Sequence, residues 1–296
     1  MPDSSHGRNE NTELSHLGIF SALSGITESW RKEYEIWGAN ELWERLKNGA
    51  YPEKTQDTPL GERIKKYNEE EVKYEIEKYH STFIYPDHPN WPRALDDAHP
   101  APVGLVLRGE LSVLNQLENS VSIVGTRNPT RYGERIASEF GSTLADHGWV
   151  SVSGGAMGID AAVHRGSLLA EGHTIAILAS PMNNLYPQIH HTLFEHISQS
   201  GLLITETPFG QPTVAARFLH RNRLIAALTR ATVVIEAPYR SGALRTARDA
   251  GEYLRPVFAT PGPITSPASE GVHQLIIERQ AELIVSVGDL ISLLSL

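Results

Sequence analysis

The chain has 296 residues, a formal net charge of −9 and no cysteine. This length allows one large domain and one smaller domain, with ample core. The absence of cysteine excludes disulfide bonds, thiolate metal sites and cysteine nucleophiles, and the acidic balance argues against a general polyanion binder.

No run of apolar residues approaches the ~18 that a transmembrane helix needs. The N-terminal segment MPDSSHGRNENTELSH is polar and lacks the apolar core of a signal peptide. We therefore expect a cytoplasmic protein without a membrane partner.

The positive charges are unevenly distributed along the chain. All seven lysines precede Tyr79, and every later cation is an arginine. Arginine suits bidentate phosphate contacts and stacking on bases. GC-rich codon usage would explain the same bias equally well.

The N-terminal part has a helical hydrophobic pattern. Residues 1–11 are small, polar and aperiodic, and we expect them to be disordered. Apolar spacing predicts short helices around residues 14–22 and 37–46, and a long charged helix over residues 60–80. Residues 1–80 are therefore expected to form a small helical N-terminal domain.

The remainder, residues 81–296, alternates strands with helices. Apolar runs predict strands at residues 83–86, 103–108, 121–124, 150–153, 174–179, 202–205, 232–236, 257–259 and 283–286. Helical patterns occupy residues 132–147, 160–171, 191–199, 216–228, 243–254, 271–280 and 290–296. Near-continuous apolar strands separated by helices are typical of a doubly wound α/β fold with a mainly parallel sheet.

Two small-residue turns follow neighbouring predicted strands. They are Gly125-Thr126-Arg127 and Ser153-Gly154-Gly155. Both would lie at the carboxyl edge of the sheet, where backbone N–H groups and helix N-termini bind anions. We interpret Arg127 as a phosphate or base contact, although a capping or salt-bridging arginine would fit the same pattern. Neither turn matches the Walker or GxGxxG pattern, which argues against a nucleoside triphosphatase or an ordinary NAD enzyme.

A later helix and turn add further hydrogen-bond donors. Arg217 and Arg221 are four residues apart and share one helix face, and Asn222 and Arg223 follow directly. This density of donors favours phosphate or nucleotide contact over a solvated face. Ser241-Gly242 begins another helix after a strand, and it is either a second anion site or an ordinary turn.

Local geometry disfavours two further kinds of site. Asp160 and His164 are one helical turn apart, but a capping aspartate and a packed histidine explain this spacing without chemistry. His190 and His191 would point about 100° apart on a helix, so together with His196 they serve a single ion poorly. We therefore predict no catalytic residue, no metal ion and no cofactor.

Six ordered motifs give the chain a resemblance to a known family. They are VGTRNPTRYGERIA, VSGGAMGIDAAVHRG, the Tyr186-Pro187 pair, FLHRNRLIAAL, VVIEAPYRSGALRTA and VFATPGPITSPASEGVH. The lead-in from Tyr85 to Gly109 fits as well. Over about residues 81–289 the chain resembles the DNA-processing protein family DprA, also called Smf, in its actinobacterial form.

The resemblance implies an extended Rossmann-like domain that binds single-stranded DNA without catalysis. It also implies a homodimer that protects incoming DNA and helps to load the RecA recombinase during natural transformation. The strand-binding pocket that it implies comprises Gly125, Thr126, Arg127, Ser153, Gly154, Gly155, Arg221, Asn222 and Arg223.

The chain departs from the family pattern at three positions in these motifs. Thr126, Met157 and Leu219 stand where many relatives carry serine, arginine and proline. The chain also ends without the C-terminal winged helix of many relatives, so we expect no duplex binding from such a module.

Two other functions stay open. The fold is akin to nucleotide-processing proteins of the lysine-decarboxylase-like (LOG) type, which use a glutamate for N-glycosidic cleavage. Glu206 and Glu236, near predicted strand ends, would then be the catalytic candidates, although the PGGxGT motif is absent at residues 238–246. The third function is a nucleotide-sensing binding protein in phage defence.

Overall fold

The computed structural model describes residues 6–23, 27–49 and 59–295. Within these residues a nine-stranded sheet runs through the molecule in the order β1-β2-β6-β5-β4-β3-β7-β8-β9. The strands are β1 (Thr82–Ile84), β2 (Leu105–Gly109), β3 (Ser120–Val124), β4 (Val150–Ser153), β5 (Thr174–Leu178), β6 (Leu202–Thr205), β7 (Ala231–Val234), β8 (Val257–Ala259) and β9 (Glu282–Leu283).

The strand order reverses beside β3. The chain runs outward from β3 through β4 and β5 to β6, and it then returns to the other side of β3 with β7. All strands from β6 to β9 along the sheet are parallel, whereas β1 and β2 pair in antiparallel fashion. The predicted mainly parallel, doubly wound fold is confirmed, and its topological switch point lies between β3 and β7.

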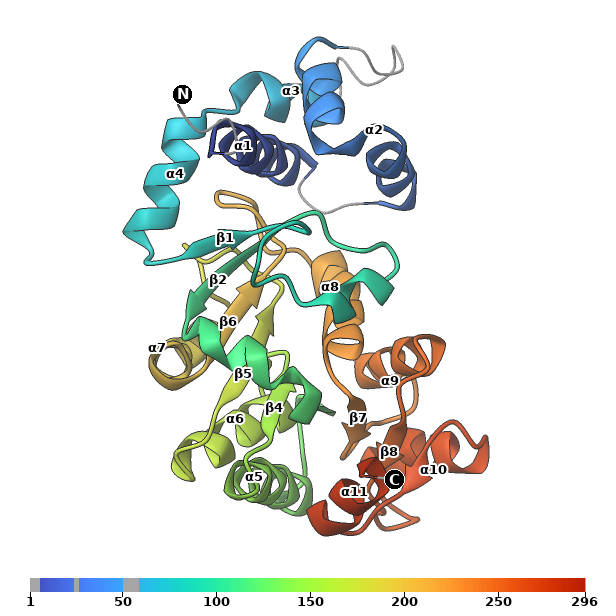
Figure 1. Ribbon diagram of the computed structural model, residues 1–296. Helices are drawn as coiled ribbons and strands as arrows, with labels where there is room; N and C mark the ends of the chain where they lie inside the picture. Colours follow the sequence, from blue (N-terminus) through green and yellow to red (C-terminus); the bar gives the residue numbers. More distant parts are fainter. Residues whose placement is uncertain (1–5, 24–26, 50–58, 296) are drawn as a thin grey trace.

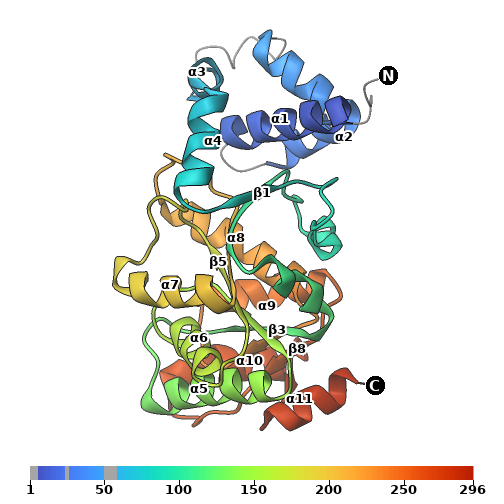
Figure 2. The same cartoon turned by 60° about the vertical axis from the view of Figure 1, so that its left-hand side comes forward.

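Helices cover both faces of the sheet, as Figures 1 and 2 show. They are α5 (Arg131–Asp146), α6 (Ile159–Leu169), α7 (His191–Ser200), α8 (Ala215–Leu228), α9 (Gly242–Glu252), α10 (Glu270–Ile277) and α11 (Val287–Leu294). Short 3₁₀ helices are η2 (Arg93–Asp97), η3 (Leu111–Asn119), η4 (Gln188–His190) and η5 (Pro267–Ser269).

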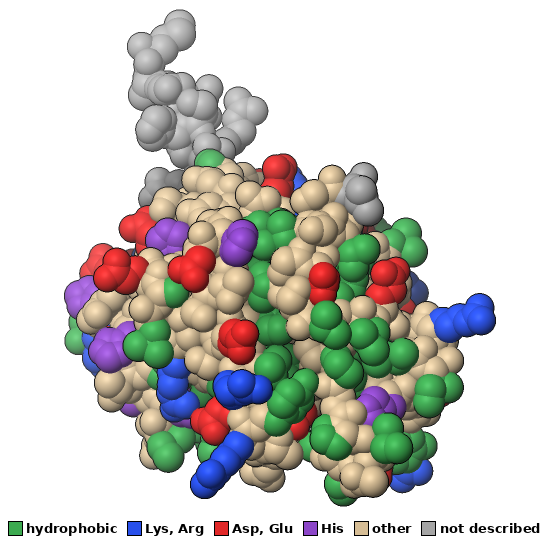
Figure 3. Space-filling model, turned by 90° about the horizontal axis from the view of Figure 1, so that it is seen from below, with side chains coloured by type: hydrophobic (Ala, Val, Ile, Leu, Met, Phe, Trp, Pro, Cys, Tyr) green, Lys and Arg blue, Asp and Glu red, His purple; other side chains and the backbone are tan. Residues whose placement is uncertain are grey.

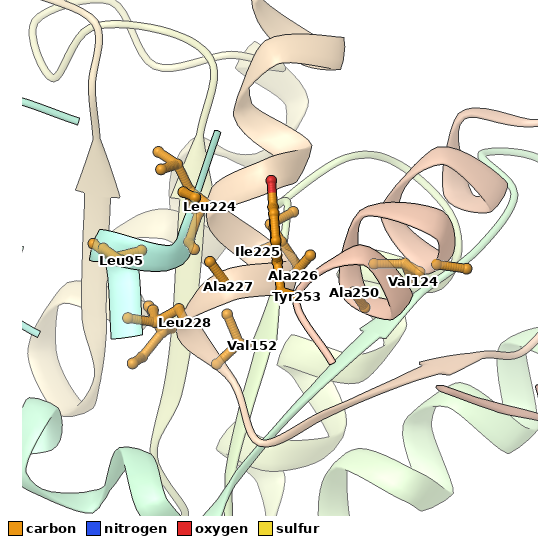
Figure 4. Packing of buried hydrophobic residues seen from close by; sticks show 14 of the residues in the cluster. Leu95, Val124, Val152, Leu224, Ile225, Ala226, Ala227, Leu228, Ala250 and Tyr253 are labelled. Carbon is orange, nitrogen blue, oxygen red and sulfur yellow. The ribbon is translucent and has the colours of Figure 1, made fainter. Parts of the chain in front are cut away.

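Two apolar layers hold six of these helices to the sheet, and α7 packs in a separate cluster. On one face, α5, α6 and α11 pack against strand residues such as Ile123 and Val233. On the other face, α8, α9 and α10 pack against residues such as Val152 and Ile177. Figure 4 shows part of this second layer, where side chains of α8 lie beside Leu95 of η2 and Val152 of β4.

The N-terminal helices form their own cluster and also pack on the edge of the sheet. They are α1 (His6–Leu23), α2 (Glu28–Lys47), α3 (Pro59–Lys66) and α4 (Glu69–Lys78). Trp43 and Leu46 are buried in the apolar cluster of these helices. Phe20 of α1 packs against Phe83 of β1, with the ring centroids 5.3 Å apart. The helical part and the sheet therefore share apolar contacts at the boundary expected near residue 80.

Two N-terminal expectations differ from the structure. Residues 1–5 of the segment expected to be disordered lie outside the described residues, whereas residues 6–11 form the first turns of α1. The single helix predicted over residues 60–80 is wrong, because the segment divides into α3 and α4. Asn68 ends the continuity by accepting a hydrogen bond from Glu71 N at 3.3 Å, which makes it the N-cap of a new helix.

None of the described helices is both long and apolar enough to span a membrane.

Candidate nucleic-acid interface

A cleft of about 660 Å³ opens at the carboxyl edge of the sheet, at the switch point between β3 and β7. Its walls come from the turn after β3, the turn after β4 with Asp160, the loop after β5, the helix α8 and the turn before α9. Six of the residues predicted for the site line it: Gly125, Arg127, Arg221, Asn222, Ser241 and Gly242. Thr126, Ser153, Gly154, Gly155, Arg217 and Arg223 are not among its lining residues.

The rim of this cleft carries an arginine and two aromatic rings. Arg127 is exposed, and its guanidinium carbon lies 5.2 Å from the centroid of the Phe218 ring. The Tyr186 ring meets Phe218 edge-on with centroids 5.6 Å apart, and Tyr186 is 47% exposed. These three side chains come from three separate segments, so the fold brings a cation and a ring platform to one place.

Sequence reasoning did not assign a binding role to Phe218 or Tyr186. Both residues stand inside motifs that were noticed, the FLHRNRLIAAL helix and the Tyr186-Pro187 pair. The available signal was an aromatic residue beside Arg217 at the start of a helix. That signal was weak, because only the folded loop after β5 brings Tyr186 to α8.

The turn after β3 is fixed by its own backbone. A Cβ atom at Gly125 would lie 2.6 Å from Ile159 Cγ1 and 2.8 Å from Glu236 O, so close packing requires glycine there. Thr126 is buried, and its N–H donates to Glu236 O at 2.6 Å while its carbonyl accepts from Ile159 N at 3.2 Å. Gly125 and Thr126 therefore determine where Arg127 emerges.

The turn after β4 is occupied by a carboxylate of the chain itself. Asp160 accepts hydrogen bonds from Gly154 N at 3.0 Å and from Ala156 N at 3.3 Å. Ser153 is buried and donates to Ile123 O at 2.7 Å, and Gly155 takes a left-handed conformation with φ +67°. The backbone N–H groups of this turn, which were predicted to bind a phosphate, thus bind the carboxylate of Asp160. Burial raises the pKa of Asp160, and the positive charge of Arg221 acts in the opposite direction.

Arg221 ties α8 to the ends of two strands. Its Nη1 donates to Gly154 O at 2.7 Å and also to Ile177 O, and burial lowers its pKa to about 10. A Cβ atom at position 154 would lie 2.6 Å from the Arg221 guanidinium carbon, so Gly154 makes room for this arginine. Among the described residues its Nε has no hydrogen-bond partner, and Arg221 lines the cleft.

The guanidinium of Arg223 makes its hydrogen bonds inside the protein. It donates to Glu206 Oε1 at 2.7 Å, to Pro100 O at 2.8 Å and to His220 O at 3.0 Å. Arg217 is half-buried, and burial lowers its pKa. Asn222, in contrast, lines the cleft and donates from Nδ2 to Gly242 O at 3.3 Å, which joins α8 to the turn before α9.

The two glutamates considered for catalysis are both engaged in structure. Glu236 is buried and accepts from Thr130 N at 2.9 Å and Thr130 Oγ1 at 2.6 Å, which fixes the start of α5. Glu206 pairs with Arg223. Neither glutamate is among the lining residues of the cleft.

Two of the histidines considered at the sequence level make hydrogen-bond contacts inside the fold. His164 is fully buried, its Nδ1 lies 2.7 Å from Thr174 Oγ1, and burial lowers its pKa to about 3. His190 Nδ1 lies 3.1 Å from Gly155 O. No group of three or more metal-ligating side chains is found among the described residues.

A family model described as DNA recombination-mediator protein A matches residues 82–295. The chain belongs to this family. Among its members, the DNA processing protein DprA of Mycobacterium tuberculosis is 41% identical over 220 residues, which cover 70% of this chain and 56% of that protein. DprA of Streptococcus pneumoniae is 34% identical over 231 residues, covering 78% of this chain and 80% of that protein. The chain therefore spans about half the length of the mycobacterial relative.

Solved structures of two family members have the same fold. The crystal structure of DprA from Streptococcus pneumoniae matches with a TM-score of 0.79 at 28% identity, covering 95% of this chain and 97% of that one. DprA from Helicobacter pylori matches with a TM-score of 0.66 at 30% identity, covering 73% and 97% respectively, and that protein is described as having a unique single-stranded DNA binding mode. The resemblance drawn from the sequence motifs is confirmed.

Proposed function

We propose that this protein binds single-stranded DNA in the cleft at the switch point and acts by binding, without a catalytic step. The observation that carries the proposal is the rim formed by Arg127, Phe218 and Tyr186. Stacking on aromatic rings and contact between arginine and phosphate are the interactions that hold single strands.

The composition of the cleft favours a single strand over a duplex. An aromatic ring can stack only on a base whose face is exposed, which a single strand offers and a duplex hides. A net charge of −9 also disfavours a broad phosphate-binding face. A relative of this chain, DprA of Helicobacter pylori, is described as binding single-stranded DNA.

Three features of the inner wall suit a phosphate. Helix α9 begins at Gly242, where nothing lies within 4 Å of the position that a Cβ atom would take, so a ligand can approach the backbone. Ser241 lines the wall beside it. Arg221 Nε supplies a buried donor without a partner among the described residues. All three residues line the cleft, which supports a phosphate contact there.

We infer that the bound strand is passed to a RecA-type recombinase during natural transformation. The support is the family itself, which is described as a recombination mediator. The expected result is faster RecA assembly on DNA coated with a single-strand-binding protein. Assembly at the uncatalysed rate would contradict the inference.

We also infer a homodimer built on the edge strand β9. Exposed apolar side chains surround this edge, with Ile277 79%, Leu283 51% and Val285 69% exposed. Figure 3 shows hydrophobic side chains gathered on the lower end of the molecule, the end that carries α10 and α11 in Figure 1. A second copy of the chain can cover an exposed apolar patch of this kind in an isologous dimer. Light scattering should find a dimer that Leu283→Glu dissociates, and a monomeric wild type would refute this part.

The decisive test of strand binding is a titration with fluorescent oligo-dT at two salt concentrations. Arg127→Ala should weaken binding about tenfold and should reduce the salt slope by about 0.7, the value expected for one lost phosphate contact on a single strand. Arg135→Ala removes an exposed arginine from α5 outside the cleft and should behave as wild type. An Arg127→Ala variant with wild-type affinity and slope would sink the proposal. Nucleotide hydrolysis that disappears in Glu236→Gln would favour an enzyme instead.

A further inference from the structure

A second cleft of about 660 Å³ adjoins the first. The walls of both clefts include Leu219, Ser241 and Gly242, so the turn before α9 lies between the two clefts. The far wall of the second cleft carries four side chains that suit a polyanion: Tyr239, Arg240, Arg245 and Arg248. No carboxylate is among its lining residues.

The three arginines are held in different ways and all are exposed. Arg240 lies over the ring of Tyr239, 5.3 Å from its centroid, in a left-handed conformation with φ +64°. Arg245 Nε pairs with the buried carboxylate of Asp249 at 2.6 Å, which fixes its direction. Within the described part of the chain no carboxylate pairs with Arg240 or Arg248, so their charge is available to a ligand.

We propose that the DNA strand leaves the first cleft across Gly242 and continues along this second cleft. This inference rests on the proposed function and extends it to the path of the strand. Arg240, Arg245 and Arg248 bind consecutive backbone phosphates, and the exposed ring of Tyr239 stacks on a base.

The geometry of α9 and of its first residue fits a continuous strand better than two separate ligands. Arg245 and Arg248 are three residues apart on α9, so their Cβ atoms are about 5–6 Å apart along one face. Gly242 is exposed, and the space where a Cβ atom would lie is open. The DNA backbone can therefore pass from the first cleft to the second close to the protein main chain at Gly242.

The test compares two lengths of oligo-dT, about 4 and about 16 nucleotides, which bracket the site sizes of single-strand clefts. The double variant Arg240→Gln/Arg248→Gln removes the two arginines that lack a carboxylate partner. It should bind the long oligonucleotide about tenfold more weakly and with a salt slope reduced by about 1.4, twice the single-strand value. It should bind the short one as wild type, because the first cleft alone holds it.

A matched control removes two exposed arginines from the α5–α6 face. Arg135 and Arg165 line a groove there, and neither is a lining residue of the two clefts. Arg135→Gln/Arg165→Gln should leave both lengths unaffected. Tyr239→Ala removes the ring without a charge, so it should weaken binding of the long oligonucleotide and keep the wild-type salt slope.

The outcomes separate this inference from the proposed function. If Arg127→Ala leaves both lengths unaffected, the proposed function fails. If Arg127→Ala weakens both but Arg240→Gln/Arg248→Gln keeps the wild-type slope on the long oligonucleotide, only the strand path is refuted. Equal losses on both lengths in the double variant would also refute it, since the arginines would then act on the first cleft or on the fold.

Discussion

We expect Arg223 to stabilise the fold and not to contact DNA. Breaking its ion pair with Glu206 tests this expectation. The two side chains are 4% and 9% exposed, and Nη2 lies 2.7 Å from Oε1. Arg223→Met keeps an unbranched apolar side chain but removes the guanidinium that pairs with the buried carboxylate of Glu206. Removing one partner of a buried pair costs about 3–5 kcal/mol of unfolding free energy.

A second ion pair in the same chain provides the control. Arg255 and Asp97 have the same 2.7 Å separation, but their side chains are 26% and 54% exposed. Because water screens that pair, Arg255→Met should cost no more than about 1 kcal/mol. The N···O distance is identical, so the two pairs differ in burial and in the further hydrogen bonds that Arg223 donates to Pro100 O and His220 O.

Urea unfolding at neutral pH measures both variants, together with the double variant Arg223→Met/Glu206→Gln. The double variant should regain most of the lost stability, because it no longer buries an unpaired charge. A loss below about 1 kcal/mol for Arg223→Met would refute the structural role. So would a variant of wild-type stability that binds oligo-dT weakly, since Arg223 would then be a DNA contact.

Three further predictions concern packing, pH and stacking. Gly154→Ala should cost about 1–3 kcal/mol in urea unfolding, because its methyl group collides with Arg221, whereas Gly242→Ala enters open space and should not perturb the fold. Burial lowers the pKa of His164 to about 3 and that of His16 to about 4 from an ordinary 6.5. As the pH falls, the unfolded chain therefore takes up these protons before the folded chain does. The free energy of unfolding should fall below pH 6.5 by about 1.4 kcal/mol per pH unit for each histidine, until the folded pKa of that histidine is reached. His164→Asn should remove one of these two slopes from urea unfolding measured between pH 6.5 and about 4. Phe218→Ala should weaken oligo-dT binding by about 1–3 kcal/mol in a fluorescence titration, and Phe218→Tyr should restore it.

Most of the α/β fold could be predicted because the strands are buried on both faces. A run such as residues 121–124 is apolar at nearly every position, and its turn and helix follow in regular order. The N-terminal part was harder, because α3 and α4 are short, charged helices and a local cap separates them. The break at Asn68 depends on a single side-chain hydrogen bond, which hydrophobic periodicity does not register.

The candidate site could be located from the sequence but not fully resolved into roles. Turns at the carboxyl ends of strands pointed to the edge where the cleft opens, and Arg127, Ser241 and Gly242 line that cleft. What the sequence could not show is which polar groups satisfy one another. Asp160 fills the glycine turn, and Arg221 bonds to strand carbonyls, only because the fold brings these distant segments together.

If the proposed function holds, some arginines position the cleft and others meet the strand, which is how an acidic protein would present a DNA site. Arg221 and Arg223 hold the walls of the first cleft in place, and Arg127 is left exposed on its rim. A single exposed cation gives little affinity at physiological salt, so stacking and strand length must supply the rest. A strand that spans two clefts would also meet the exposed arginines of the second one, and a dimer that doubles the clefts would raise affinity through effective concentration. The same arrangement would release a short fragment readily, since such a fragment engages one cleft at a time.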